Sequence, residues 1–120
     1  MNKKQAVEYG LTKNGAYLDF PFVGNDYAVI KIKNDKTGKN RIFAEIFSLG
    51  ELDMLTFSAD KDLTINLRNQ YPDKIKKGYH CPSVQAQYKS SLELTQFDDI
   101  TIKQFIDLSY SLAKVKLKIK

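Results

Sequence analysis

The sequence predicts an α+β fold, with a central antiparallel sheet of about five strands and helices packed on it in the order α-β-β-β-α-β-β-α. Short polar loops separate the alternating apolar segments, which favours antiparallel neighbours. Segments with apolar residues three and four positions apart stand before, between and after the strands. The 120 residues suit a single domain spanning positions 1–120, which is large enough to bury a core.

The first segments are a short helix and an extended stretch. Residues 3–12 are expected to be helical, with Ala6 and Tyr9 toward the core. Residues 16–20 are expected to be extended, because Pro21 biases the residue before it away from helical geometry. We therefore expect the sheet proper to begin after this proline.

A hairpin and a third strand form the predicted centre of the sheet. Residues 27–33 alternate, and one face of this strand carries Ala28, Ile30 and Ile32. The polar loop 34–40 has the glycine that a hairpin turn needs. The return strand, 41–48, has apolar residues on both faces, and a further strand is expected at 52–57.

A second helix is expected over residues 59–69. Ser58 is the predicted N-cap, because serine hydroxyls accept hydrogen bonds from free N–H groups of the first turn. Leu63 and Leu67 are four residues apart and form its apolar stripe. Residues 71–80 then form a basic, aromatic connector between this helix and the next strand.

Alternation over residues 86–94 predicts the next strand. Ser90 and Leu92 belong to its buried face, whereas Lys89 and Ser91 belong to a face exposed to solvent. The last helix is expected to begin at a capping box.

In that capping box, Thr101 pairs with Gln104, and Ile100 and Phe105 form a hydrophobic staple around it. The helical pattern extends to about residue 115.

The composition narrows the expected location and partners. The net charge is +5 and the pI is about 9.2, which permits an anionic partner without requiring one. Cys81 is the only cysteine, so no internal disulfide forms and a reducing compartment is expected. The sequence has no apolar run long enough to cross a membrane and no signal-peptide pattern, so we expect a cytoplasmic protein without a membrane partner.

The residues that could perform chemistry do not form a catalytic set. His80 is the only histidine and has only Cys81 beside it, and two adjacent residues do not make a tetrahedral metal site. We expect His80 to hold the connector through a backbone hydrogen bond. Asp98 and Asp99 are explained by their place before a helix N-terminus. With no phosphate-binding or dinucleotide-binding glycine motif, the prediction is a protein that is not an enzyme and needs no metal or cofactor.

Short motifs along most of the chain resemble those of the MmcQ/YjbR family of small bacterial proteins. The matching residues are Pro21, Phe22, Phe43, Arg68, Tyr71, Pro72, Gly78, Tyr79, His80, Ser109 and Tyr110. The resemblance implies an α+β fold similar to type III secretion chaperones and to the frataxin-like CyaY arrangement. It also implies DNA binding through a double-wing motif. The second histidine and the tryptophan that usually follow the family's Gly-Tyr-His are absent here, with Tyr88 the nearest replacement for the tryptophan.

Lysines and arginines gather in three parts of the chain. They lie on the hairpin (Lys31, Lys33, Lys36, Lys39, Arg41), on the connector (Lys74, Lys76, Lys77) and at the chain end (Lys114, Lys116, Lys118, Lys120). Clusters that share a face would contact phosphates of a duplex, with loop 34–40 as a wing. The leading hypothesis is a weak, largely sequence-independent DNA-binding module that uses the hairpin and connector clusters.

Two other interpretations explain the same features. The charges are also those of a solvated surface that keeps a small domain soluble. Alternatively, the chain is a chaperone-like or dimerising domain that binds a protein or peptide through a sheet edge or an aromatic patch. The residues of that predicted patch are Tyr27, Phe43, Phe47 and Tyr79.

Overall fold

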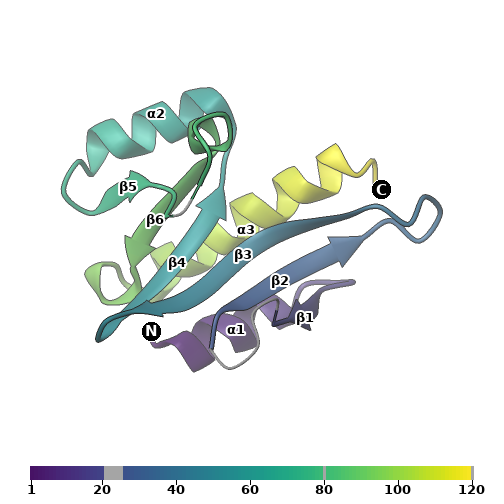
Figure 1. Cartoon of the computed structure of the whole chain (residues 1–120), viewed down its shortest axis with the longest axis horizontal. Coiled ribbons are helices and arrows are strands. Elements are labelled where there is room, and N and C mark those ends of the chain that lie inside the picture. The colour runs from purple at the N-terminus through teal and green to yellow at the C-terminus, as the bar shows by residue number, and fades with distance from the viewer. Residues whose placement is uncertain (21–25, 80, 120) are drawn as a thin grey trace.

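The computed structural model describes residues 1–20, 26–79 and 81–119, and Figure 1 shows how its helices and strands are arranged. The elements are α1 (Lys3–Leu11), β1 (Tyr17–Asp19), β2 (Ala28–Lys33), β3 (Asn40–Leu49), β4 (Leu52–Ser58), α2 (Lys61–Gln70), β5 (Ile75–Lys77), the 3-10 turn η1 (Gln85–Gln87), β6 (Lys89–Glu93), the 3-10 turn η2 (Leu94–Gln96) and α3 (Asp99–Lys116). The predicted α+β class is confirmed.

The strands form one antiparallel sheet in the order β1-β2-β3-β4-β6-β5. The sheet has six strands where about five were expected. The additional strand is β1, the extended segment before the proline, which pairs with β2 through Leu18 and Ile30. Between β2 and β3 the register shifts after Ile30, so that Phe43 is an extra residue on β3.

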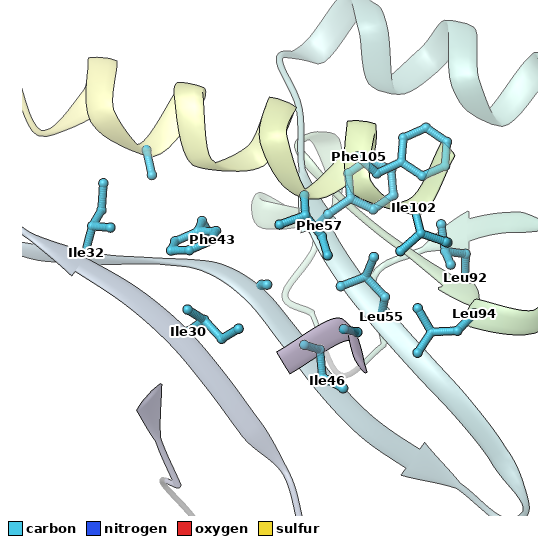
Figure 2. Close-up of a cluster of buried hydrophobic side chains, with 14 of the residues drawn as sticks. Ile30, Ile32, Phe43, Ile46, Leu55, Phe57, Leu92, Leu94, Ile102 and Phe105 are labelled. Carbon is cyan, nitrogen blue, oxygen red and sulfur yellow. The ribbon is translucent and has the colours of Figure 1, made fainter. Parts of the chain in front are cut away.

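The core lies between one face of the sheet and helices α1 and α3 (Figure 2). Phe57 of β4 stacks on Phe105 of α3, with ring centroids 4.8 Å apart. Gly10 of α1 is buried directly against Ile30, and a Cβ at this position would overlap the Cδ1 atom of Ile30. Glycine at this position lowers the stability of the helix but allows α1 to approach the sheet closely.

The opposite face of the sheet is also covered, which corrects the predicted exposure of β6. Ser91 is only 3% exposed, although alternation assigned it to the face in contact with solvent. The chain that follows β5 lies against this face: the Tyr79 N–H donates to Ser91 Oγ (2.9 Å), and the Tyr79 ring stacks on Phe47. Strand β6 is also shorter than predicted, because residues 85–87 form a 3-10 turn.

Aspartates, not the predicted hydroxyl residues, cap the two later helices. The carboxylate of Asp60 accepts the first-turn N–H of α2, and Ser58 instead belongs to β4. The carboxylate of Asp98 accepts the Thr101 N–H (2.8 Å), so α3 begins before the predicted capping box. Ile100 is 69% exposed and cannot act as half of a hydrophobic staple.

Candidate nucleic-acid interface

The β2–β3 hairpin and the C-terminal end of α3 meet at one end of the molecule (Figure 1). Asn34 joins them, because its side-chain amide donates to the Leu117 carbonyl (2.8 Å). The same side chain accepts the N–H of Lys36 (2.9 Å), and its backbone carbonyl accepts the N–H of Gly38 (2.8 Å). One residue thus shapes the hairpin loop and attaches it to the helix end.

Cations concentrate at this junction, which we call the basic end. It consists of Lys33, Lys36, Lys39 and Arg41 on the hairpin and Lys114, Lys116 and Lys118 at the end of α3. The side chains of the hairpin members are exposed. Lys31 is different, because its ammonium pairs with Asp19 of β1 at 2.9 Å and its side chain is only 20% exposed. Within these two segments Asp35 is the only acidic residue. Lys120 of the predicted C-terminal cluster lies outside the described residues.

The connector cluster lies at a different edge of the sheet. Lys76 and Lys77 are on β5, which is separated from β3 by β6 and β4. At about 4.8 Å per strand, β5 is roughly 14 Å from β3 and 19 Å from β2. Lys76 Nζ donates to the Pro72 carbonyl (2.7 Å), and Lys74 Nζ lies 5.8 Å from the centre of the Phe97 ring. The hairpin cluster is therefore brought together with the C-terminal lysines, and not with the connector lysines.

A groove of about 490 Å³ opens beside the basic end, between α3, the start of β3 and the loop that precedes β6. Arg41 and Lys116 line it from β3 and α3, while Gln85 and Tyr88 line it from the loop. The remaining lining residues are Asn40, Ile42, Ser58, Lys89, Ser109, Leu112 and Ala113. Among the described residues that line this groove there is no carboxylate, so its electrostatic potential is positive.

Arg68, one of the family motif residues, holds the loop wall of the groove. Its Nη2 donates to the carbonyls of Ala86 (2.6 Å) and Lys89, and its Nε donates to Ser90 Oγ (3.2 Å). The Lys89 carbonyl also accepts the N–H of Gly78 (3.0 Å). A Cβ on Gly78 would come within 3.1 Å of the Lys89 Cβ, so glycine allows this close approach.

Ser109 and its neighbour, which are also motif residues, connect α3 to the sheet. Ser109 Oγ donates to the carbonyl of Phe43 (2.6 Å) and accepts the N–H of Ser58 (2.8 Å). The Tyr110 ring packs edge-on against Phe43, and its hydroxyl donates to the Asn14 carbonyl. These motif residues therefore have structural roles. Three others, Pro21, Phe22 and His80, lie outside the described residues.

A polar and aromatic cluster lies on the face of the sheet away from the helices. Glu45 accepts hydrogen bonds from the hydroxyl of Tyr27 (2.8 Å) and from Lys89 (3.3 Å). Burial, together with the Glu45 carboxylate, raises the pKa of Tyr27 above its ordinary value. The rings of Tyr27, Phe47 and Tyr79 form one continuous stack. The stack of Tyr79 on Phe47 holds the segment around Tyr79 against this face of the sheet.

The predicted aromatic patch is only partly exposed: Tyr79 is 40% exposed, but both phenylalanines are buried. Phe43 is 1% exposed and faces α3, and Phe47 is 2% exposed within the ring stack.

Burial raises the pKa of the Cys81 thiol despite the nearby cations, so the thiol stays protonated near neutral pH and is a poor nucleophile.

The described part of the chain has no group of three histidine, cysteine or acidic side chains placed to hold a metal ion. None of the helices described combines the length and apolarity needed to cross a bilayer.

Some residues at the groove were not identified from the sequence. Alternation assigned Tyr88 to the buried face of a strand, whereas its side chain is 40% exposed beside the groove. Charge identified Arg41 and Lys116, but their proximity depends on how α3 crosses the sheet. Gln85 gave no signal, because nothing local distinguishes it from other surface amides.

Comparison with known proteins gives a family and a shared fold. The model of the YjbR family matches residues 11–112. A Deinococcus radiodurans protein with a DUF419 domain has a similar crystal structure, with a TM-score of 0.78 and 16% identity over 99% of this chain and 89% of that one. A Pseudomonas syringae protein aligns with a TM-score of 0.71 and 21% identity over 94% of this chain and 99% of that one. No curated protein matches the chain.

Proposed function

The chain belongs to the YjbR family, and from this premise we propose that it is a non-enzymatic module that binds DNA through the phosphate backbone. The observation that supports the proposal is the basic end, where the hairpin and the end of α3 present their cations side by side. We assign the DNA-binding wing that the family resemblance implies to the β2–β3 hairpin.

The chemistry of the basic end favours phosphate contacts over base readout. Six of its seven cations are lysines, with Arg41 as the only guanidinium. A lysine ammonium is a compact charge that attracts phosphate without the bidentate geometry that arginine uses to recognise a base edge. We therefore expect weak binding that depends little on sequence and strongly on salt.

The connection between the two segments supports a single rigid binding surface. Asn34 bonds both to its own loop and to the Leu117 carbonyl, so the hairpin and helix end move together. Cations held on a common framework lose less conformational entropy on binding than cations on independent segments. The two segments are expected to contact one duplex together.

Fluorescence anisotropy with a labelled duplex at several salt concentrations tests the proposal. If Z phosphates are engaged, the logarithm of the association constant falls with the logarithm of salt with a slope of about −0.9Z. Replacing Lys36, Lys39 and Lys118 by glutamine is expected to weaken binding and to reduce the slope by up to about 2.7.

The connector supplies the matched control. The triple change of Lys74, Lys76 and Lys77 to glutamine removes the same charge from a different edge of the sheet, and is expected to have a much smaller effect. Equal losses in the two variants, or no binding by the unmodified protein at ~50 mM salt, would contradict the proposal. Dimer formation in light scattering, combined with absence of DNA binding, would instead favour the protein-interaction alternative.

A further inference from the structure

We propose that the groove beside the basic end binds one unpaired nucleotide of a single nucleic-acid strand, with its base on Tyr88 and its phosphates on Arg41 and Lys116. This inference rests on the proposed function and specifies which form of nucleic acid the basic end binds best. It uses the groove between α3, β3 and the loop before β6, to which Arg41 and Lys116 of the basic end both contribute.

The charges of the groove select an anionic ligand. Arg41 and Lys116 line the same groove, and neither side chain has a hydrogen-bond or ion-pair partner among the described residues. The ammonium of Lys89, which also lines the groove, is already bonded to Glu45. Two unpaired cations that share a groove without a carboxylate repel each other, and a phosphate between them relieves this repulsion.

Tyr88 provides a platform for a planar base. Its ring is 40% exposed, while its backbone is held by two hydrogen bonds: its N–H donates to Gln85 and its carbonyl accepts from Ala59 (2.8 Å). Arg68 holds the residues on both sides of it through the carbonyls of Ala86 and Lys89. An aromatic ring in a rigid setting beside cations is the arrangement on which unpaired bases stack.

The size and position of the groove favour a single strand over a duplex. A volume of about 490 Å³ lies within the range of pockets that hold small ligands, roughly 300–1,000 Å³, and so suits one nucleotide. In a duplex the faces of each base are covered by stacking, so only an unpaired base can place its face on Tyr88. The amides of Asn40 and Gln85 line the same groove and can contact base edges.

The test compares a labelled single strand with the same sequence folded as a hairpin duplex, using fluorescence anisotropy. The unmodified protein is expected to bind the single strand more tightly. Tyr88→Leu is expected to weaken single-strand binding by about 5- to 150-fold, the range for one base–aromatic stack, with little effect on the duplex. Tyr88→Phe keeps the ring and is expected to retain the affinity.

The phosphate contacts have a separate readout. The pair of changes Arg41→Gln and Lys116→Gln is expected to reduce the salt slope for the single strand by about 1.4, because each phosphate that is no longer neutralised lowers the slope by about 0.7. Thermal unfolding of each variant checks that the fold is retained, which the exposure of these side chains favours.

Three outcomes would overturn the inference in different ways. Equal affinity for both forms, with Tyr88→Leu behaving like the unmodified protein, would overturn it and leave the proposed function standing. Saturable binding of adenosine monophosphate without any preference for single strands would overturn the assignment to a strand. Binding to neither form would overturn the proposed function as well.

Discussion

Replacing Ser109 by alanine is expected to destabilise the fold markedly, although the change removes one oxygen atom. The β3–β4 ladder ends at the pair Ala44–Phe57, and the next backbone groups are the carbonyl of Phe43 and the N–H of Ser58. The hydroxyl of Ser109 donates to that carbonyl and accepts from that N–H. It thus bridges β3 and β4 one residue beyond their last pair, at Phe43, the extra residue in the pairing of β3 with β2.

The expected size of the effect follows from these two hydrogen bonds. Leaving one buried polar group unpaired costs about 1–3 kcal/mol, so two such groups cost about 2–6 kcal/mol. Ser109 lines the groove, which gives water some access after the change, and alanine adds about 0.5 kcal/mol of helix propensity. We therefore expect a loss of about 2–3 kcal/mol in the free energy of unfolding.

Urea unfolding followed by circular dichroism measures this loss. With a slope of about 1–3 kcal/mol per molar urea, the midpoint is expected to fall by roughly 1 M or more at an unchanged slope. Ser111→Ala is the matched control, because it makes the same change on an exposed position of α3 and should shift stability by less than about 0.5 kcal/mol. If the two variants unfold at the same urea concentration, the assigned role of the Ser109 hydroxyl is wrong.

Two further predictions concern the packing and charge of α1 and α3. Gly10→Ala should destabilise the protein by about 1–2 kcal/mol, because overlap with Ile30 outweighs the helix propensity gained. In an Ile30→Val background, which lacks the Cδ1 atom, the same change should stabilise the protein by up to ~1 kcal/mol. Urea midpoints of the four proteins decide this, and identical effects in both backgrounds would exclude the overlap. For Asp107, burial acts to raise the pKa, but hydrogen bonds from Lys13 and Tyr9 leave it below the ordinary value of 3.8. The resulting stabilisation is present above about pH 4 and is lost as the pH falls through the folded-state pKa, so Asp107→Asn should flatten the acid side of a stability–pH profile.

The elements of the fold were predictable where local pattern and tertiary environment agree. Ile30 and Ile32 alternate with Lys31 and Lys33, and both isoleucines face the core as expected. Ser91 was assigned wrongly because its cover comes from a distant part of the chain, where Tyr79 folds across the sheet. The start of α2 was predicted wrongly because both Ser58 and Asp60 can cap a helix. Ser58 is excluded as the cap only by its pairing within strand β4, which the local sequence does not show.

The sequence identified the basic residues of the candidate interface, but it did not show which of them lie together in the fold. Charge alone identified the basic clusters. Which clusters meet depends on the strand order, which places β5 away from the hairpin, and on the contact of Asn34 with Leu117, 83 positions later in the chain. No local pattern encodes either feature, since both arise when α3 packs across the sheet.

The position of β5 provides an explanation for the charges of Lys76 and Lys77 that involves no ligand. β5 is only three residues long and, in the part of the chain that the structure describes, pairs with β6 alone, so it is an edge strand of the sheet. An uncharged free edge is a template on which another chain can add a strand, and lysine side chains oppose that addition by repulsion and by the cost of desolvation. Lys76 and Lys77 are therefore expected to oppose extension of the sheet into a neighbouring molecule. In the proposed function the cations of the basic end attract a polyanion, whereas on β5 cations of the same sign oppose contact with a second copy of the chain.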